Sequence, residues 1–255
     1  MDPINPVEPP EELPILYQDE TFVAVHKPSG LLVHRSPLAR DADTAALQIV
    51  RDQLQMHIYP IHRLDRPTSG ILLFALSTES AAAIYEQLSE RTAQKEYWAL
   101  VRGWVMDPME IDSELDKNQV YPQPGKERET KLQEALTQVE PIQRVELQQP
   151  VGKYETARYT LLKVFPKTGR THQIRRHLTR ENHPLIGDTR YGDGAHNQFF
   201  RESYSCKRLM LAARSLRFNH PTSGRELYIE CPLAEDMDAL LKQLWPDGVS
   251  APSDA

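Results

Sequence analysis

The stretch HRLDRPTSG, residues 62–70, is the feature around which this sequence is organised. Its one carboxylate, Asp65, lies between two arginines, and cationic neighbours keep an acid ionised and available as a nucleophile. Pro67 fixes its own backbone angle, and the Thr-Ser-Gly that follows is typical of a turn. The apolar run at residues 71–76 then has the length of a buried strand. The sequence predicts a rigid loop that presents one acid at a sheet edge; an ion pair that only ties down the loop is the alternative.

The stretch HRLDRPTSG resembles the catalytic motif of the pseudouridine synthases of the RluA type, in which the aspartate is the nucleophile. Other blocks resemble the same family, among them HKPSG at residues 26–30 and TGRTHQIR at residues 168–175. The resemblance extends from about residue 15 to residue 233. It implies that the chain isomerises a uridine within RNA to pseudouridine, with Asp65 as the nucleophile.

Two further site residues follow from the resemblance. Tyr97 matches the tyrosine of the family's K-x-Y-x-A block, which lies against the target base; from the pattern alone it is a half-buried strand tyrosine. Arg175 matches the arginine that forms an ion pair with the catalytic aspartate. Ala212 departs from the family, which usually has histidine there, so the role of that histidine is in doubt in this chain.

The charge is unevenly distributed along the chain. The net charge is −6, yet the segment Lys153–Arg217 contains fourteen Lys and Arg against five Asp and Glu. Such a bias favours an anionic partner, although a charge-rich segment is also typical of a solvated surface. The candidate RNA-binding residues are His34, Arg35, Arg63, Arg66, Arg170 and Arg176.

The sequence contains no signal for a membrane, a metal or a cofactor. The first twenty residues lack Lys and Arg, and no apolar run approaches the roughly 20 residues of a membrane span. Two cysteines form no disulfide framework, and the histidine spacing matches no metal-ligand pattern. Without a dinucleotide fingerprint or a Walker loop, we expect a cytoplasmic enzyme with no cofactor.

We expect the α+β class, with a mixed, largely antiparallel β-sheet flanked by helices. Residues 15–245 should form a single catalytic domain, because a boundary within them would separate the family's site residues. Residues 1–14 are expected to be a flexible leader and residues 246–255 a flexible tail.

Several helices have clear boundaries in the sequence. We expect N-caps at Asp43, Ser77 and Thr171 and a final helix whose buried side contains leucines and a methionine. Residues 107–152 are rich in Gln, Glu and Pro and indicate little, apart from an exposed loop at residues 121–131.

The substrate is indicated by two segments and by an expected absence. Residues 33–41 and 192–202 resemble the branch of the family that modifies uridine-65 of tRNA, and we expect both to be recognition loops. The sequence also leaves no room for the small N-terminal RNA-binding domain of many relatives. We therefore expect a monomeric enzyme that acts on tRNA, with ribosomal RNA as the alternative substrate.

Two other classes of function remain open. A non-catalytic RNA-binding protein would use the basic segment and leave Asp65 structural. A glycoside hydrolase normally needs two carboxylates at a defined separation, and the motif supplies one.

Overall fold

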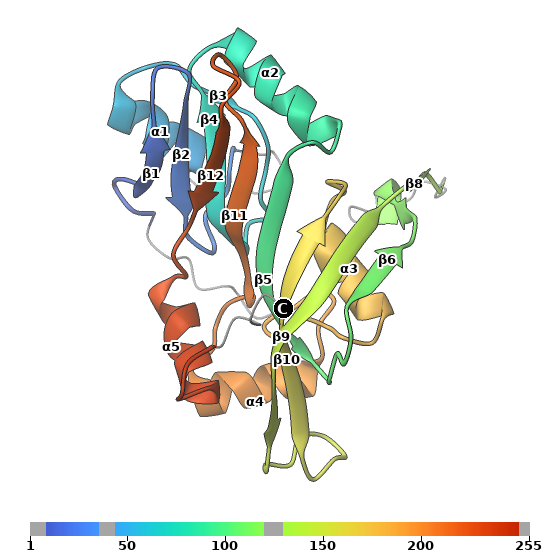
Figure 1. Ribbon diagram of the computed structural model, residues 1–255. Helices are drawn as coiled ribbons and strands as arrows, with labels where there is room; N and C mark the ends of the chain where they lie inside the picture. Colours follow the sequence, from blue (N-terminus) through green and yellow to red (C-terminus); the bar gives the residue numbers. More distant parts are fainter. Residues whose placement is uncertain (1–8, 36–43, 120–129, 250–255) are drawn as a thin grey trace, which may run out of the picture. The chain divides into compact units, whose positions relative to one another are not determined.

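The computed structural model describes residues 9–35, 44–119 and 130–249 of the chain (Figure 1). The chain divides into two compact units. The first contains Met1–Lys95 and Lys207–Met237, and the second contains Glu96–Cys206 and Asp238–Ala255. None of the helices in the described ranges has the length and apolar character that crossing a membrane requires.

The first unit is built on a β-sheet with two helices. Its strands are β1 (Ile15–Gln18), β2 (Phe22–Lys27), β3 (Tyr59–Pro60), β4 (Ser69–Ala75), β11 (Leu211–Asn219) and β12 (Glu226–Glu230); its helices are α1 (Ala46–Leu54) and α2 (Thr78–Ser89). The strand order is β1-β2-β4-β11-β12, and β3 also pairs with β4. The β4–β11 pairing is parallel and the other pairings are antiparallel, so the sheet is mixed.

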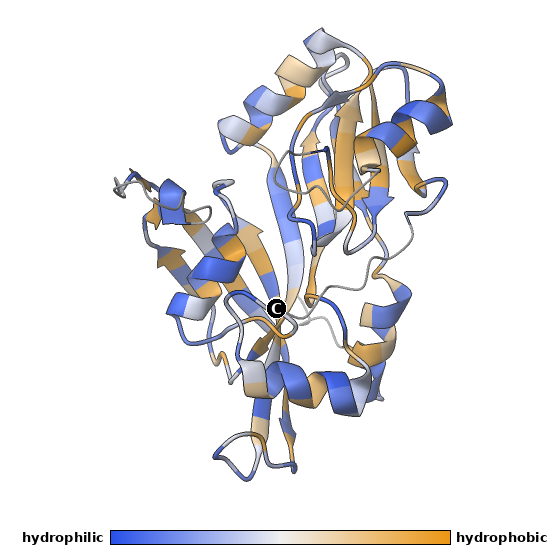
Figure 2. Cartoon of the chain, turned by 180° about the vertical axis from the view of Figure 1, so that it is seen from behind, coloured by the Kyte–Doolittle hydropathy of each residue, from blue (hydrophilic) through white to orange (hydrophobic). Residues whose placement is uncertain are grey.

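The core of the first unit forms around β4, in which every residue is buried. Figure 2 shows the strands of this unit largely in the apolar colour. Ser77 caps α2 as expected, because its side chain accepts a hydrogen bond from the Ser80 backbone amide at 3.1 Å. Ile84 of this helix is fully buried, whereas Tyr85 is 61% exposed.

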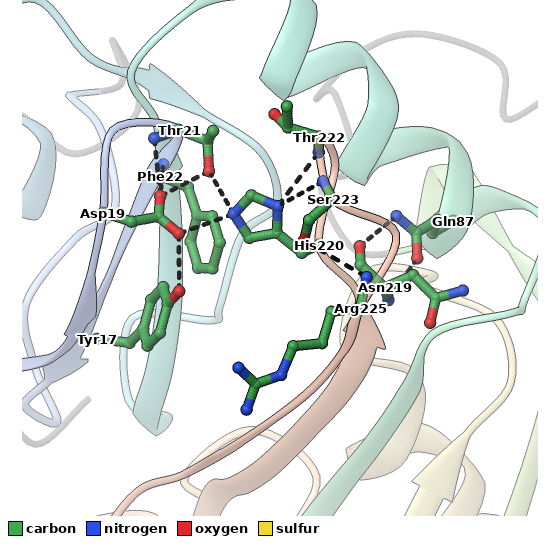
Figure 3. A network of polar contacts seen from close by, with 10 residues as sticks. All are labelled: Tyr17, Asp19, Thr21, Phe22, Gln87, Asn219, His220, Thr222, Ser223 and Arg225. Atoms are coloured by element: carbon green, nitrogen blue, oxygen red, sulfur yellow. Dashed lines mark hydrogen bonds and ion pairs between the residues drawn. The ribbon is translucent and has the colours of Figure 1, made fainter.

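A polar network joins the β1–β2 turn to the turn after β11 (Figure 3). One oxygen of Asp19 accepts hydrogen bonds from the Thr21 amide and hydroxyl, and the other accepts from Tyr17 and from His220 Nε2 at 2.8 Å. His220 Nδ1 accepts from two backbone amides, those of Thr222 and Ser223, so the ring proton lies on Nε2. Burial alone would raise the pKa of Asp19, but these hydrogen bonds outweigh it and hold the pKa below its usual value.

The second unit has an antiparallel sheet in the order β5-β10-β9-β6. Its strands are β5 (Gln94–Arg102), β6 (Met109–Asp112), β9 (Leu136–Leu147) and β10 (Ala157–Pro166), with a two-stranded ladder of β7 (Leu115–Asp116) and β8 (Leu132–Gln133) and a 3-10 turn, η1 (Lys117–Gln119). The strand β5 is the one that the sequence predicts around Tyr97. The twelve residues of β9 belong to the stretch that the sequence left uninterpreted. The α+β class with mixed, largely antiparallel pairing is confirmed.

The remaining helices are α3 (Gln173–Arg180), α4 (Gly194–Tyr204) and α5 (Glu235–Leu244). The predicted apolar side of α5 is confirmed, because all four of its expected residues are buried: Met237, Leu240, Leu241 and Leu244. The expectation of a loop at residues 192–202 is wrong. Asp193 caps α4 through the Ala195 amide, and Phe200 packs edge-on against Tyr159 at 4.7 Å.

Three predicted boundaries differ from the structure. The N-cap of α3 is His172, in the left-handed region at φ 54°, and not Thr171. The N-cap of α1 is Ala45, and the expected cap Asp43 lies outside the described residues, as does most of the loop expected at 121–131. Leu13 is buried and exchanges two hydrogen bonds with the Gln53 side chain, so it packs with the fold two residues before the expected start.

Candidate active site

Asp65 lies in a short irregular segment that leads into β4 of the first unit. Its backbone carbonyl accepts a hydrogen bond from the Thr68 amide at 3.0 Å, which closes a turn through Arg66 and Pro67. Leu64 beside it is buried, and Asp65 itself is half-buried. The prediction of an acid on a turn at the start of a buried strand is confirmed.

A second turn, at residues 28–30, holds the Asp65 turn in place. The Gly30 amide donates to the Arg66 carbonyl at 2.8 Å, and Arg66 Nε donates back to the Gly30 carbonyl at 2.9 Å. The hydroxyl of Ser29 donates to the Pro67 carbonyl at 2.7 Å. These reciprocal bonds fix the backbone on the C-terminal side of Asp65, as a preorganised catalytic group requires.

The buried ammonium group of Lys27 joins the same two turns. The residue has no exposed surface, and its Nζ donates to three carbonyl oxygens: Pro28 at 2.9 Å, Leu31 at 2.8 Å and Arg66 at 3.1 Å. Burial, together with the charge of Arg208, lowers the pKa of Lys27 to about 7, while the Asp65 carboxylate acts in the opposite direction. Lys27 thus brings a positive charge within electrostatic range of the candidate nucleophile.

The strand after the turn tolerates no side chain at Gly70. Its φ is +113°, and a Cβ there would lie 2.2 Å from the backbone oxygen of Ala213 on β11. Arg208 donates a hydrogen bond to the Ser69 hydroxyl at the start of the strand. The close approach of β4 and β11 therefore fixes the position at which the Asp65 turn ends and β4 starts.

His62, the first residue of the motif, is a structural acceptor. Its Nε2 accepts a hydrogen bond from the Leu73 amide of β4 at 3.1 Å. Burial, with a smaller contribution from the charge of Lys95, lowers its pKa to about 4, so the ring is neutral at physiological pH.

The two other candidate catalytic residues lie in the second unit. Tyr97 is half-buried on β5, opposite Val164 of β10. Arg175 lies on α3 and is 5% exposed. Its Nε and Nη2 donate to the two carboxylate oxygens of Asp188 at 2.7 and 2.8 Å.

Asp188 is the most fully bonded carboxylate of this region. In addition to both bonds from Arg175, it accepts from the backbone amides of Arg190 and Tyr191 at 2.9 and 3.0 Å. Burial would raise its pKa, but the Arg175 hydrogen bonds and charge outweigh it and hold the pKa below its usual value. The Tyr191 ring lies under the Arg175 guanidinium at 5.1 Å, and its hydroxyl contacts His172 Nδ1 at 3.0 Å.

The candidate RNA-binding residues differ in exposure. His34, Arg35 and Arg63 are exposed, whereas Arg66, Arg170 and Arg176 are partly or fully buried. Arg170 Nε donates to the Glu134 carbonyl at 2.9 Å, and Arg176 Nη2 donates to Gln119 Oε1 at 2.7 Å. Throughout the described ranges, His, Cys, Asp and Glu side chains form no group of three that could hold a metal ion.

Sequence reasoning missed Lys27 and Asp188. Each belongs to a block that the resemblance included, HKPSG and HPLIGD, without a role for the charged residue. A buried lysine has no sequence signal, because lysine is almost always exposed. The Asp188–Arg175 pair spans thirteen positions, which exceeds any local spacing rule.

The chain is similar to known proteins over most of its length. Residues 21–180 match the family described as RNA pseudouridylate synthase. The "tRNA pseudouridine synthase C" of Vibrio parahaemolyticus is 44% identical over 235 residues, which cover 91% of this chain and 94% of that protein. The protein of the same name from Salmonella typhimurium is 45% identical over 91% of this chain and 90% of its own length.

Solved structures resemble the chain as well. "Human RNA Pseudouridylate Synthase Domain Containing 1" has a TM-score of 0.69 at 25% identity, covering 92% of this chain and 90% of that one. "Human RNA Pseudouridylate Synthase Domain Containing 4" has a TM-score of 0.67 at 23% identity, covering 91% and 92%.

Proposed function

Because the chain belongs to the RNA pseudouridylate synthase family, we propose that it isomerises a uridine of tRNA, uridine-65, to pseudouridine. The observation that carries the substrate is the 44–45% identity, over at least nine-tenths of each length, to proteins named tRNA pseudouridine synthase C. The enzyme is an isomerase, and no external group enters or leaves the nucleotide.

Asp65 is the nucleophile in this proposal. It adds covalently to the target nucleotide, the N-glycosidic bond breaks, and the detached uracil turns and rejoins the sugar through carbon. The proton that leaves this carbon is balanced by the proton that the freed ring nitrogen gains. The bond to Asp65 then breaks, which releases the product and regenerates the carboxylate. The turn that holds Asp65, fixed by Lys27 and Arg66, supports this assignment, because a nucleophile must be held in place before the substrate arrives.

Tyr97 and Arg175 complete the catalytic set. Tyr97 supplies an aromatic face for the unstacked uracil, and Arg175 is the basic residue of the set. Because the resemblance spreads its motif blocks from residue 26 to residue 175, we propose that residues 15–245 act as one catalytic domain.

The RNA contacts proposed at His34, Arg35 and Arg63 are supported by their exposure. Arg66 and Arg170 have bonds inside the protein and contact RNA only through the donors that those bonds leave. The target must leave its stack to reach Asp65, at a cost of a few kcal/mol that backbone contacts offset. We propose a monomer that works in the cytoplasm.

The test measures pseudouridine in purified tRNA and ribosomal RNA incubated with the wild-type protein and with Asp65→Asn. We expect product in tRNA at one position with the wild type, and none with Asp65→Asn, which should bind tRNA with nearly wild-type affinity. Arg175→Ala should reduce turnover strongly, whereas Arg217→Ala, which removes an exposed arginine paired with Glu226, should not.

Each other outcome identifies a different error. Product in ribosomal RNA alone would refute the tRNA assignment but leave the chemistry. Binding without product in either RNA would favour a non-catalytic RNA-binding protein. Near wild-type product from Asp65→Asn would remove the nucleophile assignment.

A further inference from the structure

We propose that Arg176 and Arg180 of α3 form a binding site for a backbone phosphate of the RNA. The inference deepens the proposed function and rests on it, since the phosphate belongs to the tRNA substrate. It begins from a contrast among three arginines of one eight-residue helix. Arg175 donates through Nε and Nη2 to the carboxylate of Asp188. The acceptors of Arg176 and Arg180 among the described residues are all neutral.

Arg176 is the unusual member. It is 5% exposed, and the one hydrogen bond of its guanidinium to a described residue goes to the amide oxygen of Gln119, at 2.7 Å. The charge of Asp116 acts on Arg176 through space and raises its pKa. Burial, followed by smaller effects of neighbouring charges, lowers the Arg176 pKa. A buried charge is costly unless a counter-ion pairs with it, and the described residues offer Arg176 no carboxylate within ion-pair distance. Ionisable groups that burial perturbs in this way cluster at functional sites.

Arg180 lies one turn further along the same side of the helix. It is exposed, and its Nη1 donates to the Ser113 hydroxyl at 2.6 Å and to the Glu114 carbonyl at 2.7 Å. Both guanidinium groups are thus anchored on the segment that runs from β6 through η1. Like charges four residues apart on a helix repel, and the Arg180 charge acts on Arg176 in that sense. The printed partners of these two cations within residues 9–35, 44–119 and 130–249 are neutral oxygens, and the two cations lie four residues apart on one helix.

A phosphate matches what this pair lacks. A guanidinium presents parallel N–H donors that fit phosphate oxygens, and the described residues accept from one of the five N–H groups of Arg176. A phosphate contact carries no base information, but it fixes the register of the RNA on the enzyme. That contribution is needed for a uridine within a stem, whose base edges are paired before it leaves the stack.

The test uses the full-length protein and follows tRNA binding by fluorescence anisotropy from 50 to 300 mM salt. We expect Arg176→Met to weaken binding at low salt by about tenfold, and to make the slope of log K against log salt shallower by about one. Arg180→Gln should have the same kind of effect. Arg51→Met, which removes an exposed arginine of α1 that is already paired with Asp52, is the matched control and should leave the slope unchanged.

Thermal unfolding separates binding from a structural role. Because Arg176→Met removes a buried charge and its partner Gln119 is exposed, we expect the melting temperature to stay the same or to rise. A lower melting temperature with an unchanged salt slope would overturn the proposal, and so would an unchanged slope in Arg180→Gln. If the wild type binds tRNA but forms no pseudouridine, the proposed function fails, and the salt slopes still decide whether the phosphate site exists.

Discussion

Removing the charge of Asp188 should lower the stability of the second unit more than the substitution of any exposed charge. The substitution Asp188→Asn keeps the shape and one carbonyl oxygen, but it takes the bidentate carboxylate from the buried guanidinium of Arg175. The side chains of Arg175 and Asp188 are 6% and 1% exposed, so solvent cannot replace what is lost. The substitution also replaces one carboxylate oxygen that accepts from Arg175 by an amide NH₂ group. This group is a donor, so it would face the N–H donors of the guanidinium.

The expected cost follows from this burial. Breaking a buried ion pair by removing one partner costs about 3–5 kcal/mol of stability. For a chain of this size, that corresponds to a fall in melting temperature on the order of 10 °C. The matched control is Glu226→Gln, in the Arg217–Glu226 pair whose side chains are 46% and 62% exposed. Exposed pairs contribute about 0–1 kcal/mol, so the control should unfold within a few degrees of the wild type.

The pH dependence gives a second measurement on the same pair. The folded-state pKa of Asp188 lies below its usual value, so its contribution is fully present above about pH 4 and is lost as the pH falls through the folded-state pKa. Urea midpoints of the wild type and Asp188→Asn should therefore converge on acidification. If the two proteins unfold within about 1 kcal/mol of each other at pH 7, the pair does not stabilise the fold and our reasoning is wrong.

Two more predictions concern the Asp65 turn. Gly70→Ala places a Cβ 2.2 Å from the Ala213 backbone oxygen at a positive φ, so it should lower turnover at least about a hundredfold. The control Gly152→Ala, at φ +63° with no neighbour within 4 Å, should leave turnover unchanged. Equal turnover in the two variants would refute the close approach as the cause. The pKa of Lys27 is about 7 in the folded protein and 10.5 in the unfolded chain. Between these two pH values the free energy of unfolding should therefore rise by up to about 1.4 kcal/mol per pH unit, relative to that of Lys27→Met. Parallel urea midpoints from pH 7 to 9.5 would show that Lys27 stays charged.

The fold was predictable where the local pattern and the tertiary environment agree. The motif turn and the strand after it could be read from one polar turn and one apolar run, and α5 from its regular apolar side. The strand β9 could not, because LTQVEPIQRVEL alternates weakly and owes its state to ten paired positions on β10. The helix α4 was taken for a loop because its first residues are polar, yet it is held by an N-cap and by Phe200 in the core.

The site was predictable in its residue types and less so in its partners. The resemblance proposes Asp65, Tyr97 and Arg175 by position, but the carboxylate that binds Arg175 in the second unit is Asp188, which no spacing rule connects to it. A pairing of this kind depends on how the loop after a helix folds back onto it. The local sequence does not show which residue of the loop will then lie beside which residue of the helix. Charged residues inside a fold are therefore the part of a site that sequence reasoning identifies last.

The burial of several arginines reduces the charge that the segment Lys153–Arg217 can present to RNA. Its excess of cations favoured an anionic partner, on the assumption that the cations face solvent. Arg175 is buried and neutralised by Asp188, and the side chain of Arg208 is 7% exposed in an ion pair with Asp236. These arginines shape the protein and release no counter-ions when RNA binds, so the salt slope of tRNA binding must be smaller than the count of cations suggests. The charge that remains for RNA is the charge to which the described part of the chain brings no carboxylate, and on α3 that is the charge of Arg176 and Arg180.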